Sequence, residues 1–184
     1  MENLQPSRRT FHEAGAVSTV GAPWVKTTIT LTLLLVGATI SGGNQEVRLV
    51  RNALTAQGLP AYRIETPAAI YTLEKTGAGL ASMVDRDGTD WLGFSSVPGT
   101  GASGEYRGFP NAVHQQAGNY FHARNTATDR AVTRVVSVDP RQITVAAESD
   151  NHLWACQYDF FATHCTFTMT RMPPDKKYWV LYEG

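Results

Sequence analysis

Apolar and polar residues alternate in short runs through most of the chain after residue 69. This two-residue period is typical of half-buried β-strands, because successive side chains of a strand point to opposite faces. Turn signals rich in Gly, Asp and Pro separate the runs, for example at residues 85–88 and 139–140. The pattern predicts an all-β fold, an antiparallel β-sandwich, with no long helix. The runs are residues 70–75, 80–84, 90–94, 131–138, 143–147, 153–161, 165–169 and 178–182.

The segment before these runs, residues 44–68, has a mixed pattern. Val47, Val50 and Leu54 recur at helical spacing, which predicts a short helix, with an edge strand followed by a loop as the alternative. Residues 61–67 are expected to be extended, because the residue before a proline avoids the helical region. We therefore expect residues 44–68 to be a linker and edge element, and residues 69–184 to be the sandwich domain.

Residues 27–40 form an apolar run without charge that follows Lys26 and precedes small residues. A positive residue, a short apolar run and small residues describe a secretory signal, and the run is shorter than the ~20 residues that span a bilayer. Residues 7–11 read SRRTF, which matches the core of a twin-arginine signal. We expect residues 1–43 to be a leader or anchor and the protein to be secreted or periplasmic. The alternatives are a strand or helix of the fold, or an uncleaved membrane anchor at residues 27–40.

Composition narrows the class of protein. Lys plus Arg and Asp plus Glu number 16 each, so the net charge is zero, and nucleic acid is not an expected partner. With 42% hydrophobic and 17% charged residues, the chain has the composition of a folded domain. The two cysteines, Cys156 and Cys165, flank a predicted hairpin turn. They are expected either to form a disulfide in an exported protein or to be buried free thiols.

Polar and aromatic residues are densest at residues 105–122, where periodicity is poor and a loop is expected. Loops on a rigid sheet often carry sites. A sugar site needs planar groups for hydroxyls and carboxylates, an aromatic surface, and a group that titrates near neutrality. The alternative is an ordered loop whose polar side chains bond its own backbone. The candidates are Tyr106, His114 and His122 for catalysis, and Glu105, Arg107, Asn111 and Tyr120 for substrate binding.

Metal and cofactor sites are not expected. Two histidines and Glu105 could hold a divalent ion, but the chain lacks the close His spacings of such sites. Residues 85–90 have acidic residues at alternate positions, as in part of a calcium loop, but the distal glutamate is absent, so a hairpin turn is predicted. The glycine-rich residues 99–104 are not followed by a Lys-Ser or Lys-Thr pair and predict no phosphate site.

Residues 71–91, YTLEKTGAGLASMVDRDGTDW, resemble the opening of galactose-mutarotase-like β-supersandwich domains, in which two strands around a glycine turn lead to an Asp-Gly turn and an aromatic residue. Residues 165–169 and 178–184 are similar to the middle of such domains. The resemblance covers residues 65–184 and implies a carbohydrate ligand. It also implies that the chain holds only the first half of the domain, without the catalytic glutamate of the mutarotases.

Two functions follow as hypotheses. One is an exported carbohydrate-active protein that acts on or binds poly- or oligosaccharides, as a polysaccharide lyase, glycoside hydrolase or sugar epimerase would. The other is a non-catalytic sugar-binding or structural β-sandwich module. Convergence of Arg107, His114 and His122 on one face with Tyr106 or Tyr120 would indicate a site.

Overall fold

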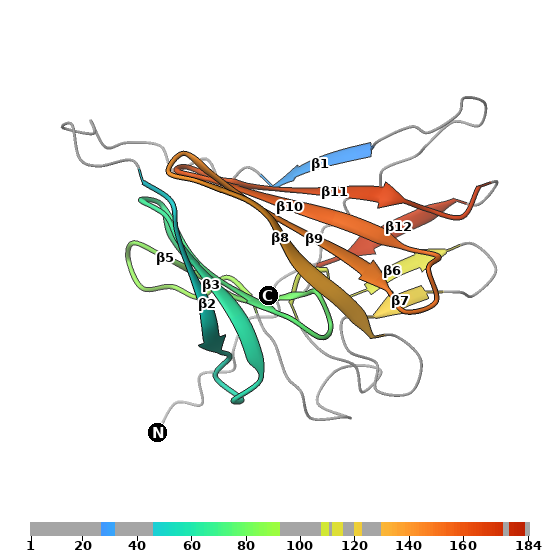
Figure 1. The fold of residues 1–184 in the computed structure, drawn as a ribbon, viewed down its shortest axis with the longest axis horizontal. Coiled ribbons are helices and arrows are strands. Elements are labelled where there is room, and N and C mark those ends of the chain that lie inside the picture. The colour runs from blue at the N-terminus through green and yellow to red at the C-terminus, as the bar shows by residue number, and fades with distance from the viewer. Residues whose placement is uncertain are drawn as a thin grey trace, which may run out of the picture.

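The computed structural model describes residues 27–31, 46–92, 108–110, 112–115, 120–122, 130–174 and 177–182. Every regular element in these ranges is a β-strand, and every strand pairing is antiparallel (Figure 1), so the predicted all-β antiparallel fold is confirmed. The strands are β1 (Thr27–Leu31), β2 (Arg48–Leu54), β3 (Pro60–Glu65), β4 (Ala69–Glu74), β5 (Leu80–Asp85), β6 (Ala112–Gln115), β7 (Tyr120–His122), β8 (Ala131–Asp139), β9 (Gln142–Ser149), β10 (Ala155–Phe161), β11 (Cys165–Arg171) and β12 (Tyr178–Leu181).

The strands form three sheets. A five-stranded sheet has the order β1-β11-β10-β9-β8, a four-stranded sheet has the order β2-β3-β4-β5, and a three-stranded sheet has the order β12-β6-β7. In Figure 1 the four-stranded sheet, in teal and green, lies beside the long strands of the five-stranded sheet, in orange and red. One buried apolar cluster receives side chains from both of these sheets, which makes the arrangement sandwich-like.

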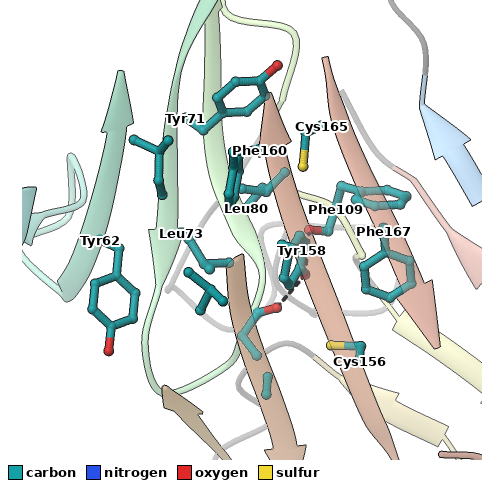
Figure 2. Close-up of a cluster of buried hydrophobic side chains, with 14 of the residues drawn as sticks. Tyr62, Tyr71, Leu73, Leu80, Phe109, Cys156, Tyr158, Phe160, Cys165 and Phe167 are labelled. Atoms are coloured by element: carbon teal, nitrogen blue, oxygen red, sulfur yellow. Dashed lines mark hydrogen bonds between the residues drawn. The ribbon is translucent and has the colours of Figure 1, made fainter. Parts of the chain in front are cut away.

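Aromatic rings occupy the centre of the core (Figure 2). Tyr71 of β4 meets Phe160 of β10 with ring centroids 5.2 Å apart, and Tyr158 and Phe109 each meet Phe167 of β11 at 5.1 Å. The first and third of these edge-to-face contacts, Tyr71 with Phe160 and Phe109 with Phe167, join elements distant in sequence. Each such pair adds about 1 kcal/mol beyond the burial of its area. Phe109 belongs to the predicted loop, yet it is a core residue, exposed over only 5% of its surface.

The hydroxyl of Tyr158 ties the two large sheets together. It donates to the carbonyl of Ala78, in the β4–β5 connection, at 2.6 Å, and it reaches the carbonyl of Phe109 at 3.4 Å. Phe109 in turn exchanges two backbone hydrogen bonds with Leu80 at the start of β5. The network links β10 to the four-stranded sheet through main-chain groups that are buried away from water.

Residues 48–54 form the edge strand β2, so the predicted short helix is wrong and the edge-strand alternative is correct. Five of the seven residues of β2 are exposed, and Leu49 packs against the core from a partly buried position. The pairing of β2 with β3 has a register shift between Val50 and Ala53, and both Val50 and Leu54 are exposed, so the strand has no regular alternation of apolar and polar residues. A strand was also predicted at residues 90–94. The described part, residues 90–92, forms an isolated bridge between Asp90 and Val84 instead of a strand.

Residues 27–31, within the predicted leader, form strand β1 at the edge of the five-stranded sheet. Ile29 lies opposite Phe167, and Thr28 and Thr30 lie opposite Thr168 and Thr166. Threonine and apolar positions of β1 therefore lie opposite the same kinds of position in β11. This pairing agrees with the alternative prediction, in which the segment is a strand of the fold. Within the described ranges, no helix has the length and hydropathy needed to cross a membrane.

The two cysteines are buried free thiols, so the predicted disulfide alternative is not formed. Cys165 lies opposite Phe160, whereas Cys156 lies opposite Met169. This register separates the two cysteines by four positions along the hairpin, about 13 Å, which a disulfide cannot bridge. Burial raises the pKa of the Cys156 thiol to about 12 and raises that of Cys165 as well.

Candidate functional site

The predicted site cluster falls only partly within the described residues. Glu105, Tyr106, Arg107 and Asn111 lie outside them, so their placement stays a prediction. His114, Tyr120 and His122 belong to strands β6 and β7, whose backbone pairing is described. A loop was predicted here, and the structure instead contains a small sheet, because β12 pairs with β6.

The register of this sheet brings the predicted residues into one row. Trp179 of β12 lies opposite His114 of β6, and His114 lies opposite Tyr120 of β7. Directly opposite residues share a face of a sheet. Neighbouring strands lie about 4.8 Å apart, so the row spans about 10 Å. We call Trp179, His114 and Tyr120 the Trp179 row.

His122 lies on the same face as the Trp179 row. His122 pairs with Ala112. His122 is two positions from Tyr120 along β7, and Ala112 is two positions from His114 along β6. Because side chains alternate with a period of two, His114, Tyr120 and His122 share one face. Three predicted candidates from two different strands are thus gathered by the tertiary pairing.

This face points away from the core. Tyr178 and Val180, which alternate with Trp179 along β12, pack from partly buried positions against the central apolar cluster. Trp179 has 43% of its surface exposed. Because this fraction of the indole is exposed, the indole presents an apolar surface that a ligand can contact.

Trp179 was missed by the sequence interpretation, which treated residues 178–182 only as a last strand. The alternation of Tyr178 and Val180 with Trp179 already indicated that the indole lies on the opposite face from the two others. The pairing of β12 with β6 joins residues far apart in sequence, and no local signal indicates it.

The acidic turn after β5 is a hairpin turn, as predicted, and the carboxylates of Asp85 and Asp90 accept hydrogen bonds from neighbouring residues. Asp85 accepts backbone bonds from Asp87 and Thr89 and a bond from the Trp91 indole at 2.8 Å. The Trp91 bond and the backbone bonds lower the pKa of Asp85. Within the described residues no group of three or more His, Cys, Asp or Glu residues could hold a metal ion.

The Trp179 row combines an exposed indole, an imidazole position and a phenol position on one sheet face. These residue types can stack on an apolar surface, exchange hydrogen bonds with hydroxyls, and transfer a proton near neutral pH. Comparison of the chain with protein-family models, with curated proteins and with solved structures found no match.

Proposed function

We propose that this protein binds oligo- or polysaccharides at the sheet face that carries the Trp179 row. The observation that supports the proposal is the register that aligns Trp179, His114 and Tyr120 across three strands, with His122 on the same face. A sugar ring presents C–H groups on its flat sides and hydroxyls around its edge. An exposed indole fits the first, and imidazole and phenol groups fit the second.

The proposal includes the resemblance to galactose-mutarotase-like domains, which implies the same class of ligand. Export to a secreted or periplasmic location is part of it as well. Because residues 27–31 form a strand of the five-stranded sheet, we expect the exported form to retain them. Mass spectrometry of the secreted protein measures its N-terminus, and an intact chain found only in the cytoplasm contradicts export.

Catalysis is the second candidate, favoured by the position of His114 directly opposite Tyr120. Histidine and tyrosine can act as base and acid, as in a lyase that removes a proton next to a uronate carboxylate. Arg107, the residue predicted to neutralise that carboxylate, lies outside the described residues. Incubation with acidic polysaccharides, followed by measurement of the ultraviolet absorbance of the unsaturated product, separates turnover from binding.

The experiment that tests binding compares Trp179→Ala with the wild type on a glycan array, followed by titration of each glycan that binds. Loss of the exposed indole is expected to weaken binding about ten-fold or more, the effect of losing one good stacking contact. Trp91→Ala is the matched control, because Trp91 is also exposed, at 36%, but lies outside the row. Equal loss in both variants, or no glycan binding by the folded wild type, refutes the proposed site.

A further inference from the structure

The five-stranded sheet has a second face, opposite the core, which is polar along its middle strands. In β10 the buried Tyr158 and Phe160 alternate with the half-buried Gln157 and Asp159. Pairing of β10 with β9 and β11 places the buried Thr144 and the half-buried Thr166 on either side of Asp159, and Ala146 and Thr168 on either side of Gln157. We call this set the polar face: Gln142, Thr144, Gln157, Asp159, Thr166 and Thr168.

A hydrogen-bond network is built around Asp159 at the centre of the polar face. Its Oδ1 accepts from Gln142 Nε2 at 2.9 Å and from the Thr144 hydroxyl at 2.7 Å, and its Oδ2 accepts from Gln157 Nε2 at 2.9 Å. Each glutamine is therefore held with its amide group in a set orientation. Their amide oxygens accept no hydrogen bond from the residues that the structure describes, which leaves them open to hydroxyl donors of a ligand.

The charge of Asp159 selects against acidic ligands. All three of its partners are neutral, and no Lys or Arg forms an ion pair with it in the described part of the chain. A second carboxylate brought to this face would meet an uncompensated negative charge, whereas neutral hydroxyls can both donate and accept there. The chemistry of the polar face therefore fits a neutral, hydroxyl-rich molecule.

An aromatic pair closes one end of the polar face. Phe161, opposite Gln142, stacks on His164 with ring centroids 4.7 Å apart and planes 22° apart. Both residues are half-buried, and the hydroxyl of Thr163 lies 3.0 Å from His164 Nδ1. At the other end, beyond Gln157, Glu148 is bonded to His152 and Arg171, which close the polar face with an ion-pair cluster.

We propose that the polar face binds a neutral polysaccharide chain that runs along the strands from the Phe161–His164 pair to Gln157. The rows of Phe161, Asp159 and Gln157 lie about 7 Å apart, so they cover about 13 Å, a length over which several hydroxyls of a chain can bond. The oriented amides reduce the entropy lost on binding. The inference rests on the proposed function for its class of ligand, but it uses a different sheet and different residues.

The test is affinity electrophoresis of the full chain in gels that contain one polysaccharide each. The neutral probes are a soluble β-glucan, a galactomannan, an arabinoxylan and dextran, and the acidic probe is polygalacturonate. The variants are Gln142→Ala with Gln157→Ala together, Thr168→Val alone, and Trp179→Ala as the variant of the other sheet. Loss of two oriented amides is expected to weaken binding of at least one neutral probe about ten-fold or more, in a variant that still unfolds cooperatively on heating.

The outcomes separate this inference from the proposed function. Retention by a neutral probe that is reduced in the double variant supports the polar face, whether or not Trp179→Ala also reduces it. Retention that falls in Trp179→Ala and is unchanged in the double variant overturns the polar face and leaves the proposed function standing. Failure of every neutral probe to retain the wild type, or retention by polygalacturonate alone, also overturns it. If the double variant does not fold, Thr168→Val decides, because removing the half-buried Thr168 hydroxyl leaves the Asp159 network intact. Wild-type retention by this variant then overturns the inference.

Discussion

Replacement of Tyr158 by phenylalanine removes one hydroxyl from the place where the two large sheets meet. The side chain is fully buried, and its hydroxyl donates to the Ala78 carbonyl at 2.6 Å (Figure 2). The variant loses a net hydrogen bond and leaves a buried carbonyl without its donor, for a total of about 2 kcal/mol in the free energy of unfolding. Since the ring remains, the aromatic contacts with Phe160 and Phe167 are kept.

Urea unfolding followed by tryptophan fluorescence measures this effect. With a urea slope of about 2 kcal/mol per molar, a loss of 2 kcal/mol lowers the midpoint by about 1 M, and the melting temperature by about 4–8 °C. Tyr71→Phe is the matched control, because Tyr71 lies in the same core but its hydroxyl makes no hydrogen bond within the described residues. An unchanged midpoint for Tyr158→Phe, or an equal loss in both variants, refutes the reasoning.

Three further predictions concern buried thiols and the turn after β5. Cys156 and Cys165, whose pKa values burial raises, are expected to react with a thiol reagent only as fast as the protein unfolds, and rapid reaction at neutral pH in the native protein contradicts their burial. Gly88→Ala is expected to cost about 1 kcal/mol, because Gly88 has a φ of +84° with open space around it, and a stability equal to wild type in thermal unfolding argues against backbone strain. Asp85 has a lowered pKa, so its charged form stabilises the fold above its ordinary range, and this contribution is lost as the pH falls through the lowered value. Asp85→Asn is therefore expected to reduce stability near pH 7 and to matter less near pH 2, and a difference independent of pH rules out the charge of Asp85 as the cause.

The strands with clear alternation were predictable within a few residues. β9, β10 and β11 were indicated by residues 143–147, 153–161 and 165–169, and the structure places them at Gln142–Ser149, Ala155–Phe161 and Cys165–Arg171. Such strands have one face on the core and one on solvent, so apolar and polar residues alternate along them with a period of two. The turn after β5 was predictable as well, because Asp and Gly at residues 85–88 allow the conformations that a tight turn needs.

The exceptions have identifiable causes. In β2 a register shift and broad exposure remove the alternation, and helical spacing remains by coincidence. Residues 27–31 lie in the segment expected to be a leader, and no local signal indicated their pairing with β11, which places Ile29 opposite Phe167. Phe109 lies in a segment without periodicity, and its contacts with Phe167 and Leu80, both distant in sequence, make it a core residue.

The candidate site, too, could be predicted from the sequence only in part. The sequence alone identified His114, Tyr120 and His122 as chemically suitable, and it determined the alternation that puts Trp179 on the opposite face from Tyr178 and Val180. Only the tertiary structure decided that Trp179, His114 and Tyr120 form one row, and that Cys156 and Cys165 lie too far apart to be bridged. The physical reason is that the period of a strand is a local property of the chain, whereas strand partners and register are chosen by the burial of distant apolar residues against one another.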